Sequence, residues 1–346
     1  MTIAQIVPVW GPYIPEYSRG INAVARDLSR GLIKKGHKVK IIAPLGSRVD
    51  QGMELVETIT SASKRGFSLF DRETMGLSLI HAQKAAQLAS GADVIHNHME
   101  YLFLPMVKFL KTSVVSTVHG VEFPSEAVPL FQAFPEHFFV AISKKAVANL
   151  PFINFKKVIY NGIDLSKYKF SRKKKDFLLW MGRITPKKGV HLAVEAAQKT
   201  GTELILAGLK EKREADYFQK IYKEAKASSK ITLLGRVSEK EKQKLLSEAL
   251  AFLFPILWEE PFGLVMAEAM ASGTPVVGFA RGSVPEIVRD GVTGFVVPSE
   301  KGVSGLISAV RKLEEINPSD CRQWVEEKFT LERMVEEYEK VYNLII

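Results

Sequence analysis

Residues 251–271, AFLFPILWEEPFGLVMAEAMA, pass from an apolar run of strand length to an apolar helical stretch through a short charged segment. The run Ala251–Pro255 predicts a buried strand, and Pro261 suits the first turn of the helix that follows. Gly263 would let a ligand approach the backbone closely, because it carries no side chain. Free amides and the dipole at the start of a helix favour an anion, so the stretch predicts a phosphate site.

Two carboxylates flank this predicted phosphate site. Glu260 precedes the helix, and Glu268 lies deeper in it, about 9 Å along the axis at about 1.5 Å per residue. Carboxylates do not bind phosphate, so their natural partners are hydroxyl groups on either side of it. A nucleotide sugar has this order of groups, with a sugar, a diphosphate and a ribose. The alternative is an ordinary acidic helix, which is disfavoured because Glu268 falls within an apolar stretch.

The same alternation of strand-like runs and helical spacing extends over the rest of the chain, which predicts an α/β fold with parallel sheets covered by helices. The other expected strands are Ile3–Pro8, Val39–Ala43, Asp93–His96, Ser113–Val118, Phe138–Ile142, Val158–Tyr160, Phe177–Met181, Glu203–Ala207, Ile231–Leu234, Pro275–Phe279 and Gly294–Val297. We expect two doubly wound, Rossmann-like domains, 1–165 and 166–330. The amphipathic segment 331–346 predicts a closing helix that completes the first domain.

Composition narrows the class of protein. The chain has 346 residues, of which 46% are hydrophobic and 25% charged, as in soluble globular proteins. It contains neither an apolar run of the ~18 residues that span a membrane nor the layout of a signal peptide, so we expect a cytoplasmic protein. The single cysteine, Cys321, excludes an intramolecular disulfide framework and a cysteine-rich zinc site.

The net charge of +10 is shared evenly between residues 1–165 and residues 166–346. No basic tail or recognition helix accompanies it, which argues against a nucleic-acid partner. The basic run 172–175 predicts a solvated connection. A phosphorylated ligand or a peripheral contact with an anionic membrane surface fits the charge equally well.

A second candidate segment, GRITPKKG at 182–189, directly follows a predicted strand. Ligands of open parallel sheets bind beyond the carboxyl ends of strands, so Arg183 and Lys188 could neutralise a leaving diphosphate. A solvated basic loop is the alternative reading. The chain has no P-loop, no GxGxxG segment and no Asp-x-Asp pair, so cationic side chains and a helix dipole would replace a metal ion.

Together these segments resemble the retaining glycosyltransferases of family 4, which have the GT-B fold. Glu260 and Glu268, with seven residues between them, match the E-x7-E signature of that family. The match continues through 161–164, 182–189, 235–237, 273–277, 282–286 and 291–295. The resemblance implies metal-independent transfer of a hexose-type sugar from a UDP-, GDP- or ADP-sugar to a hydroxyl acceptor, which would be a glycan, a lipid or a small molecule.

The resemblance also implies roles for individual residues of the second domain. Arg183 and Lys188 would bind the donor diphosphate and stabilise the leaving group. Glu260 would hold hydroxyls of the transferred sugar, and Glu268 would hold the ribose. The remaining donor contacts would come from the amides of Phe262, Gly263 and Leu264 and from Arg236 and Val237 beside the nucleotide.

In the first domain, His119 resembles the family's active-site histidine near the donor sugar, although a histidine at a strand end is often structural. The glycine-rich first loop of the family is reduced here to Tyr17-Ser18-Arg19-Gly20, so only Gly20 remains for the donor. Arg19 and His98 are candidate acceptor contacts, and a metal site at the His96–His98 pair is disfavoured because no third ligand is evident.

Two other functions stay open beside a transferase. An epimerase of sugar nucleotides shares the GT-B fold and would turn over the donor without an acceptor. A nucleotide-sugar-binding protein without activity is the other, although Arg183, Lys188 and Glu260 are all present. Leu102–Lys111 could dip into a membrane surface to reach a lipid acceptor, and a buried helix explains these residues equally well.

Overall fold

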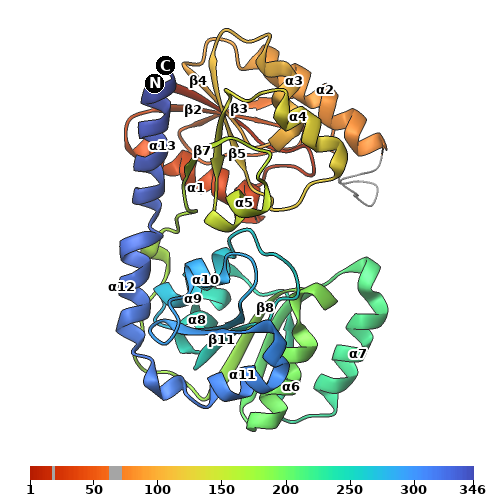
Figure 1. Cartoon of the computed structure of the whole chain (residues 1–346), viewed down its shortest axis with the longest axis vertical. Helices are drawn as coiled ribbons and strands as arrows, with labels where there is room; N and C mark the ends of the chain where they lie inside the picture. Colours follow the sequence, from red (N-terminus) through yellow and green to blue (C-terminus); the bar gives the residue numbers. More distant parts are fainter. Residues whose placement is uncertain (18–19, 62–71) are drawn as a thin grey trace. The chain divides into compact units, whose positions relative to one another are not determined.

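The computed structural model describes residues 1–17, 20–61 and 72–346, which form two α/β units (Figure 1). The first unit comprises Met1–Gly162 together with Leu331–Ile346, and the second comprises Ile163–Thr330. The division therefore falls between Gly162 and Ile163 rather than after residue 165.

The first unit is built on a seven-stranded sheet with the order β3-β2-β1-β4-β5-β6-β7, in which every neighbouring pair is parallel. Its strands are β1 (Thr2–Ile6), β2 (Lys38–Ala43), β3 (Met53–Glu57), β4 (Val94–Asn97), β5 (Ser113–Val118), β6 (Phe138–Ala141) and β7 (Phe155–Val158). Its α-helices are α1 (Ile21–Lys34), α2 (Arg72–Leu88), α3 (Leu104–Val107), α4 (Val128–Gln132), α5 (Lys144–Asn149) and α13 (Leu331–Ile345).

Sequence and structure differ most at the two edges of this sheet. Strand β3 was not predicted, and the last strand was expected at Val158–Tyr160 but ends at Val158. Edge strands are half-exposed and carry charges such as Lys156, which is solvent-exposed. Their patterns therefore lack the continuous apolar runs that mark strands buried on both faces.

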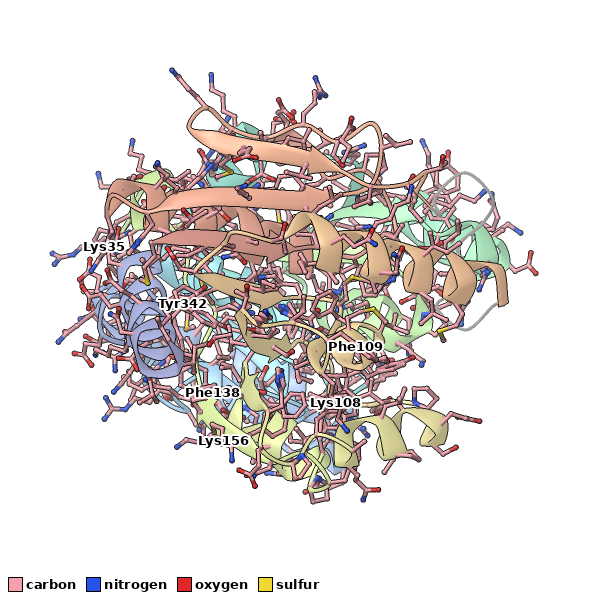
Figure 2. All side chains as sticks on the ribbon, turned by 90° about the horizontal axis from the view of Figure 1, so that it is seen from above. Lys35, Lys108, Phe109, Phe138, Lys156 and Tyr342 are labelled. Atoms are coloured by element: carbon pink, nitrogen blue, oxygen red, sulfur yellow. The ribbon has the colours of Figure 1, made fainter. Side chains whose placement is uncertain are left out.

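Helix α13 packs beside α1, so the end of the chain lies in the first unit (Figure 1). The two helices approach closely at Gly31, where a Cβ atom would lie 2.3 Å from Val335 Cγ2. On its buried face, Tyr342, labelled in Figure 2, has no exposed surface, and Tyr338 is 1% exposed. The amphipathic spacing of this segment predicted such a face.

The second unit has a six-stranded parallel sheet with the order β10-β9-β8-β11-β12-β13. The strands are β8 (Phe177–Ile184), β9 (Glu203–Lys210), β10 (Ile231–Gly235), β11 (Ala251–Phe254), β12 (Val276–Phe279) and β13 (Gly294–Val297). The α-helices are α6 (Val190–Thr200), α7 (Ala215–Lys226), α8 (Glu239–Glu248), α9 (Leu264–Ala271), α10 (Val284–Ile287), α11 (Gly302–Val310) and α12 (Pro318–Lys328). The strand order reverses between β8 and β11, where doubly wound sheets bind their ligands.

The basic run 172–175 is a connection with three exposed residues, as its charge predicted, but Lys174 is partly buried. Lys174 Nζ donates to the carbonyl oxygens of Ser247 and Ser272 at 3.1 and 3.0 Å and to Thr274 Oγ1 at 2.8 Å. Burial lowers the pKa of Lys174 to about 8. This lysine therefore satisfies acceptors near the ends of α8 and α9.

Two further expectations from the sequence were an unreactive Cys321 and helices that do not span a membrane. Cys321 is fully buried, and burial raises the pKa of its thiol to about 12, as suits an unreactive cysteine. Within the described ranges, no helix is both long and apolar enough to cross a bilayer.

Candidate functional site

Lys188 and Glu260 form an ion pair at the reversal point of the second sheet. Lys188 Nζ lies 2.6 Å from Glu260 Oε2, and the two side chains are only 19% and 13% exposed. Their loops, which follow β8 and β11, are joined by a hydrogen bond from the Leu257 amide to the Lys187 carbonyl oxygen at 2.8 Å. The sequence prediction that these loops share one site therefore has a structural basis for this pair.

Gly189 makes the close approach of these two loops possible. Its φ of 66° lies in the left-handed region, and a Cβ atom here would be 1.8 Å from the carbonyl oxygen of Pro255. The Trp180 indole further fixes the turn by donating to the Lys188 carbonyl oxygen at 3.2 Å. A larger residue at position 189 would separate Lys188 from Glu260.

Aromatic rings lie beneath the Lys188 ammonium group. Its Nζ is 4.8 Å from the centroid of the Trp258 ring and 5.8 Å from that of Phe254, within cation–π range. The Trp258 Nε1 atom is buried and has no hydrogen-bond partner in the described part of the chain. The site thus combines the ammonium group of Lys188, the carboxylate of Glu260 and an indole N–H of Trp258 that is available to donate.

Arg183 lies within β8, which ends at Ile184 rather than at Met181 as predicted, and its side chain is much less constrained than that of Lys188. Its side chain is 65% exposed, and its closest carboxylate is Glu211, with a separation of 3.8 Å between Nη1 and Oε2. An exposed pair of this kind contributes little to stability. Arg183 is therefore able to reorient towards an anionic ligand, whereas Lys188 is already in place.

Helix α9 begins at Leu264, not at Pro261 as predicted. Gly263 occupies the N-cap position with φ 74°, a left-handed conformation in which the chain turns into the helix. The Ser283 hydroxyl holds the preceding turn by donating to the Phe262 carbonyl oxygen at 2.8 Å. The Met266 amide donates to the Gly263 carbonyl oxygen at 2.9 Å. The amides of Leu264 and Val265 precede it in the first turn, where an α-helix supplies no acceptor, and are available for an anion.

Glu268 lies within α9 and already has two donors. The Tyr168 hydroxyl is 2.7 Å and the Lys242 Nζ atom 3.0 Å from Glu268 Oε1. The side chain is 14% exposed, so part of the carboxylate is accessible. Neither partner was predicted, because both come from distant segments of the sequence.

Arg236 and Val237 follow β10 at the same edge of the sheet. Gly235, with φ 68°, turns the chain out of the strand, after which Arg236 is exposed and Val237 half-buried. Strands β9 and β8 separate β10 from β11, so these two residues lie apart from the Lys188–Glu260 pair. The structure places both residues at the expected strand end.

In the first unit, His119 is part of a buried chain of hydrogen bonds. His119 Nε2 lies 2.9 Å from His98 Nδ1, and His98 Nε2 lies 2.6 Å from Gln5 Oε1. Burial lowers the pKa of His119 to about 3 and that of His98 well below its ordinary value. His119 is thus a neutral residue at the carboxyl end of β5.

The arrangement argues against the predicted contact between His98 and an acceptor. The His98 side chain is completely buried, and both of its ring nitrogens are engaged. His96 is equally buried and bonds to Tyr342 and Thr117, at 2.7 Å from each hydroxyl oxygen. His96 in β4 and His98 just after it therefore point into the first unit rather than towards a ligand.

Sequence reasoning missed Glu100, which lies beside His119. Its Oε1 accepts hydrogen bonds from the backbone amides of His119 and Gly120, at 3.1 and 2.9 Å. Burial raises the pKa of Glu100 to about 7, against the opposing effect of the two amides. Its φ of 54° is unusual for a residue other than glycine, and such conformations concentrate at functional sites.

The remaining predictions concern the first loop and a metal ion. Gly20 precedes α1 with φ 52°, and a Cβ atom there would meet open space, so backbone conformation rather than crowding favours glycine. Arg19 lies outside the described residues. In the ranges that are described, no three His, Cys, Asp or Glu side chains are placed to share a metal ion.

Comparison with known families matches both units. A model described as "Glycosyltransferase Family 4" matches residues 18–167, and one described as "Glycosyl transferases group 1" matches residues 164–330. Among curated relatives, glycogen synthase of Mycobacterium tuberculosis is 27% identical over 358 residues, covering 89% of this chain and 86% of the relative.

Solved structures show the same architecture. Sucrose-phosphate synthase from Thermosynechococcus elongatus superposes with a TM-score of 0.81 at 18% identity, covering 99% of this chain and 98% of that one. HepE of Anabaena, solved in complex with UDP and glucose, gives a TM-score of 0.77 at 17% identity, with coverages of 99% and 100%. The GT-B fold implied by the sequence resemblance is confirmed.

Proposed function

The chain belongs to the glycosyltransferases of the GT4 type, and on this premise we propose that it transfers a hexose-type sugar from a nucleotide diphosphate sugar to a hydroxyl acceptor with retention at the anomeric carbon. The observation that carries the proposal is the Lys188–Glu260 pair at the reversal point of the second sheet. A cation beside a carboxylate suits a ligand that joins a diphosphate to a sugar rich in hydroxyls. The HepE complex with UDP and glucose gives a precedent in the same fold.

Lys188 would contribute most when the bond between the sugar and the diphosphate breaks. In the unliganded protein its charge is balanced by Glu260. A bound diphosphate would share this ammonium group, and Glu260 would then accept hydrogen bonds from sugar hydroxyls. As negative charge accumulates on the leaving phosphate, Lys188, Arg183 and the free amides of α9 would stabilise it.

The proposed transfer is balanced without a catalytic base. The bond from the anomeric carbon to the phosphate oxygen breaks, and a bond to the acceptor oxygen forms on the same face of the sugar. The acceptor's proton passes to the departing phosphate oxygen, which gives a nucleoside diphosphate as the second product. The charges of Lys188 and Arg183 would replace a metal ion, so we expect chelators to leave turnover unchanged.

Release of nucleotide from a panel of UDP-, GDP- and ADP-sugars tests this function, with and without candidate glycan, lipid and small-molecule acceptors. We expect one donor to be consumed, and Lys188→Met to lower kcat by about 100- to 1000-fold. Lys187→Met is the matched control, because Lys187 is the exposed neighbour in the same loop. Equal turnover by the two variants would refute the assigned role of Lys188.

Identifying the sugar of the remaining donor in the same reactions separates the alternative functions. An epimerase would convert the donor sugar without releasing nucleotide, and a binding protein would retain a donor without turnover under every acceptor condition. A cytoplasmic location and a membrane contact through 102–111 stay predictions. In that segment Leu102, Phe103 and Leu104 are buried, whereas Phe109, beside Lys108 in Figure 2, is 86% exposed.

A further inference from the structure

Three histidine rings lie next to one another at the carboxyl ends of β4 and β5. The ring centroids of His96 and His98 are 4.1 Å apart, and those of His98 and His119 are 5.2 Å apart. Burial lowers the pKa of all three, so each ring is neutral near neutral pH. A neutral imidazole carries one proton, and its position determines which nitrogen donates a hydrogen bond.

Gln5 determines the position of this proton on His98. The Gln5 Oε1 atom, 2.6 Å from His98 Nε2, is a carbonyl oxygen and can only accept a hydrogen bond. His98 Nε2 must therefore carry the proton, which leaves His98 Nδ1 as an acceptor. Because this acceptor lies 2.9 Å from His119 Nε2, His119 donates from Nε2.

The second nitrogen of His119 is then an acceptor with an unused lone pair. No residue in the described ranges hydrogen-bonds to His119 Nδ1, and His119 keeps 7% of its surface exposed. The His119 backbone is held separately, because its amide donates to Glu100 Oε1 at 3.1 Å. Both the ring and the main chain of this residue are therefore fixed before any ligand binds.

We propose that His98, oriented by Gln5, is a positioning residue that holds His119 in the Nε2–H form, so that His119 Nδ1 accepts a hydrogen bond from a hydroxyl group of a ligand bound to the first unit. The use of that lone pair rests on the proposed glycosyl transfer, whereas the proton positions do not. A ligand carrying a hydroxyl at this point is recognised, and one carrying only an acceptor, such as an ether oxygen, is disfavoured because two lone pairs face each other.

Nitrogen NMR of the unliganded full-length chain, with 15N-labelled histidine, tests the proton positions directly. We expect His119 and His98 each to show a protonated Nε2 and a bare Nδ1. His81 is an internal reference, because its Nε2 lies 2.9 Å from the Val7 carbonyl oxygen, which only accepts. A reversed Gln5 amide would reverse both hydrogen bonds, so a protonated Nδ1 on His119 overturns the proposal.

A pair of variants at His98 tests the consequence for catalysis. In His98→Asn the amide oxygen takes the place of Nδ1 and keeps an acceptor for His119, whereas His98→Leu removes it. We expect His98→Leu to lower kcat by about 10- to 100-fold with KM nearly unchanged, and His98→Asn to retain most of the activity. The NMR spectrum of His98→Leu should show a mixture of His119 tautomers.

Equal losses in the two variants, or full activity in His98→Leu, overturn the positioning role. The His81 signals report whether each variant is folded, and the spectrum of the unmodified chain requires no variant at all. Failure of the proposed function has a different outcome: the unmodified chain would turn over no donor, while His119 would still show the Nε2–H form.

Discussion

Lowering the pH from about 7.5 to about 5 should destabilise the first unit, because four of its histidines are buried in neutral form and a fifth, His137, is partly buried. They are His81, His96, His98, His119 and His137, and burial lowers the pKa of each below the ordinary 6.5. As the pH falls, these histidines become protonated in the unfolded chain at a higher pH than in the folded chain. Stability is therefore full above about pH 6.5 and is lost as the pH falls towards the folded pKa values.

The magnitude follows from the pKa values of about 4 for His81 and His137 and about 3 for His119. At about pH 5 each of these groups costs about 2 kcal/mol of folding free energy, or about 6 kcal/mol together. Glu100 acts in the opposite direction, because its pKa is raised to about 7 and the folded chain is protonated first. Protonation of Glu100 stabilises the folded state by about 2 kcal/mol at this pH. The net loss of folding free energy is therefore about 4 kcal/mol, without the contributions of His96 and His98.

Urea titrations read by pulsed hydrogen exchange and mass spectrometry would give the free energy of unfolding of each unit at several pH values. Peptides from β4 and β5 report the first unit, and peptides from β8 and β11 report the second unit as an internal comparison. The variant His137→Gln removes one titrating group, so the slope for the first unit should fall by about 1.4 kcal/mol per pH unit. A first-unit stability that is constant or rises on acidification would refute this reasoning.

Three further changes should have distinct effects. Gly189→Ala should lower the melting temperature and abolish donor binding, because its Cβ would lie 1.8 Å from the Pro255 carbonyl oxygen, while Gly201→Ala, with a nearest contact of 3.7 Å, should cost only about 1 kcal/mol. In chemical unfolding at neutral pH, Lys174→Met should cost about 2–4 kcal/mol by leaving buried acceptors unpaired, and a loss below about 0.5 kcal/mol would contradict that role. The pH–rate profile of the unmodified chain should change near pH 7 as Glu100 titrates, and Glu100→Gln should remove that change; an unaltered profile would show that another group is responsible.

Central strands could be predicted from sequence because they are buried on both faces. Ser113–Val118 has the predicted bounds, and the expected Ala251–Pro255 ends one residue earlier, at Phe254. The edge strand Gly294–Val297 also has the predicted bounds. The edge strand Met53–Glu57 was missed because hydrogen bonding to a single neighbour leaves it partly exposed and without a clear apolar period. Buried central strands therefore account for most of the strands that could be predicted.

The candidate site was predictable only where its residues directly follow strands. Lys188 and Glu260 were found because parallel strands bring their carboxyl ends to one edge. The contacts of Glu268 with Tyr168 and Lys242 arise from packing between segments that are distant in the sequence. Local hydrophobic periodicity therefore does not predict them. The prediction that Pro261 lies in the first turn of the helix was also wrong. The chain makes a left-handed turn at Gly263, so α9 begins at Leu264.

The contribution of α13 to the first unit has a consequence for protein synthesis. During translation, residues 1–162 emerge before 331–346, yet both belong to the same unit. Until the final helix is made, the hydroxyl partners that Tyr338 and Tyr342 provide for Thr117 and His96 are missing. All of the second unit is therefore made before the first unit is complete. The first unit, although begun first, gains these two hydroxyl partners only after residues 163–330 have been synthesised.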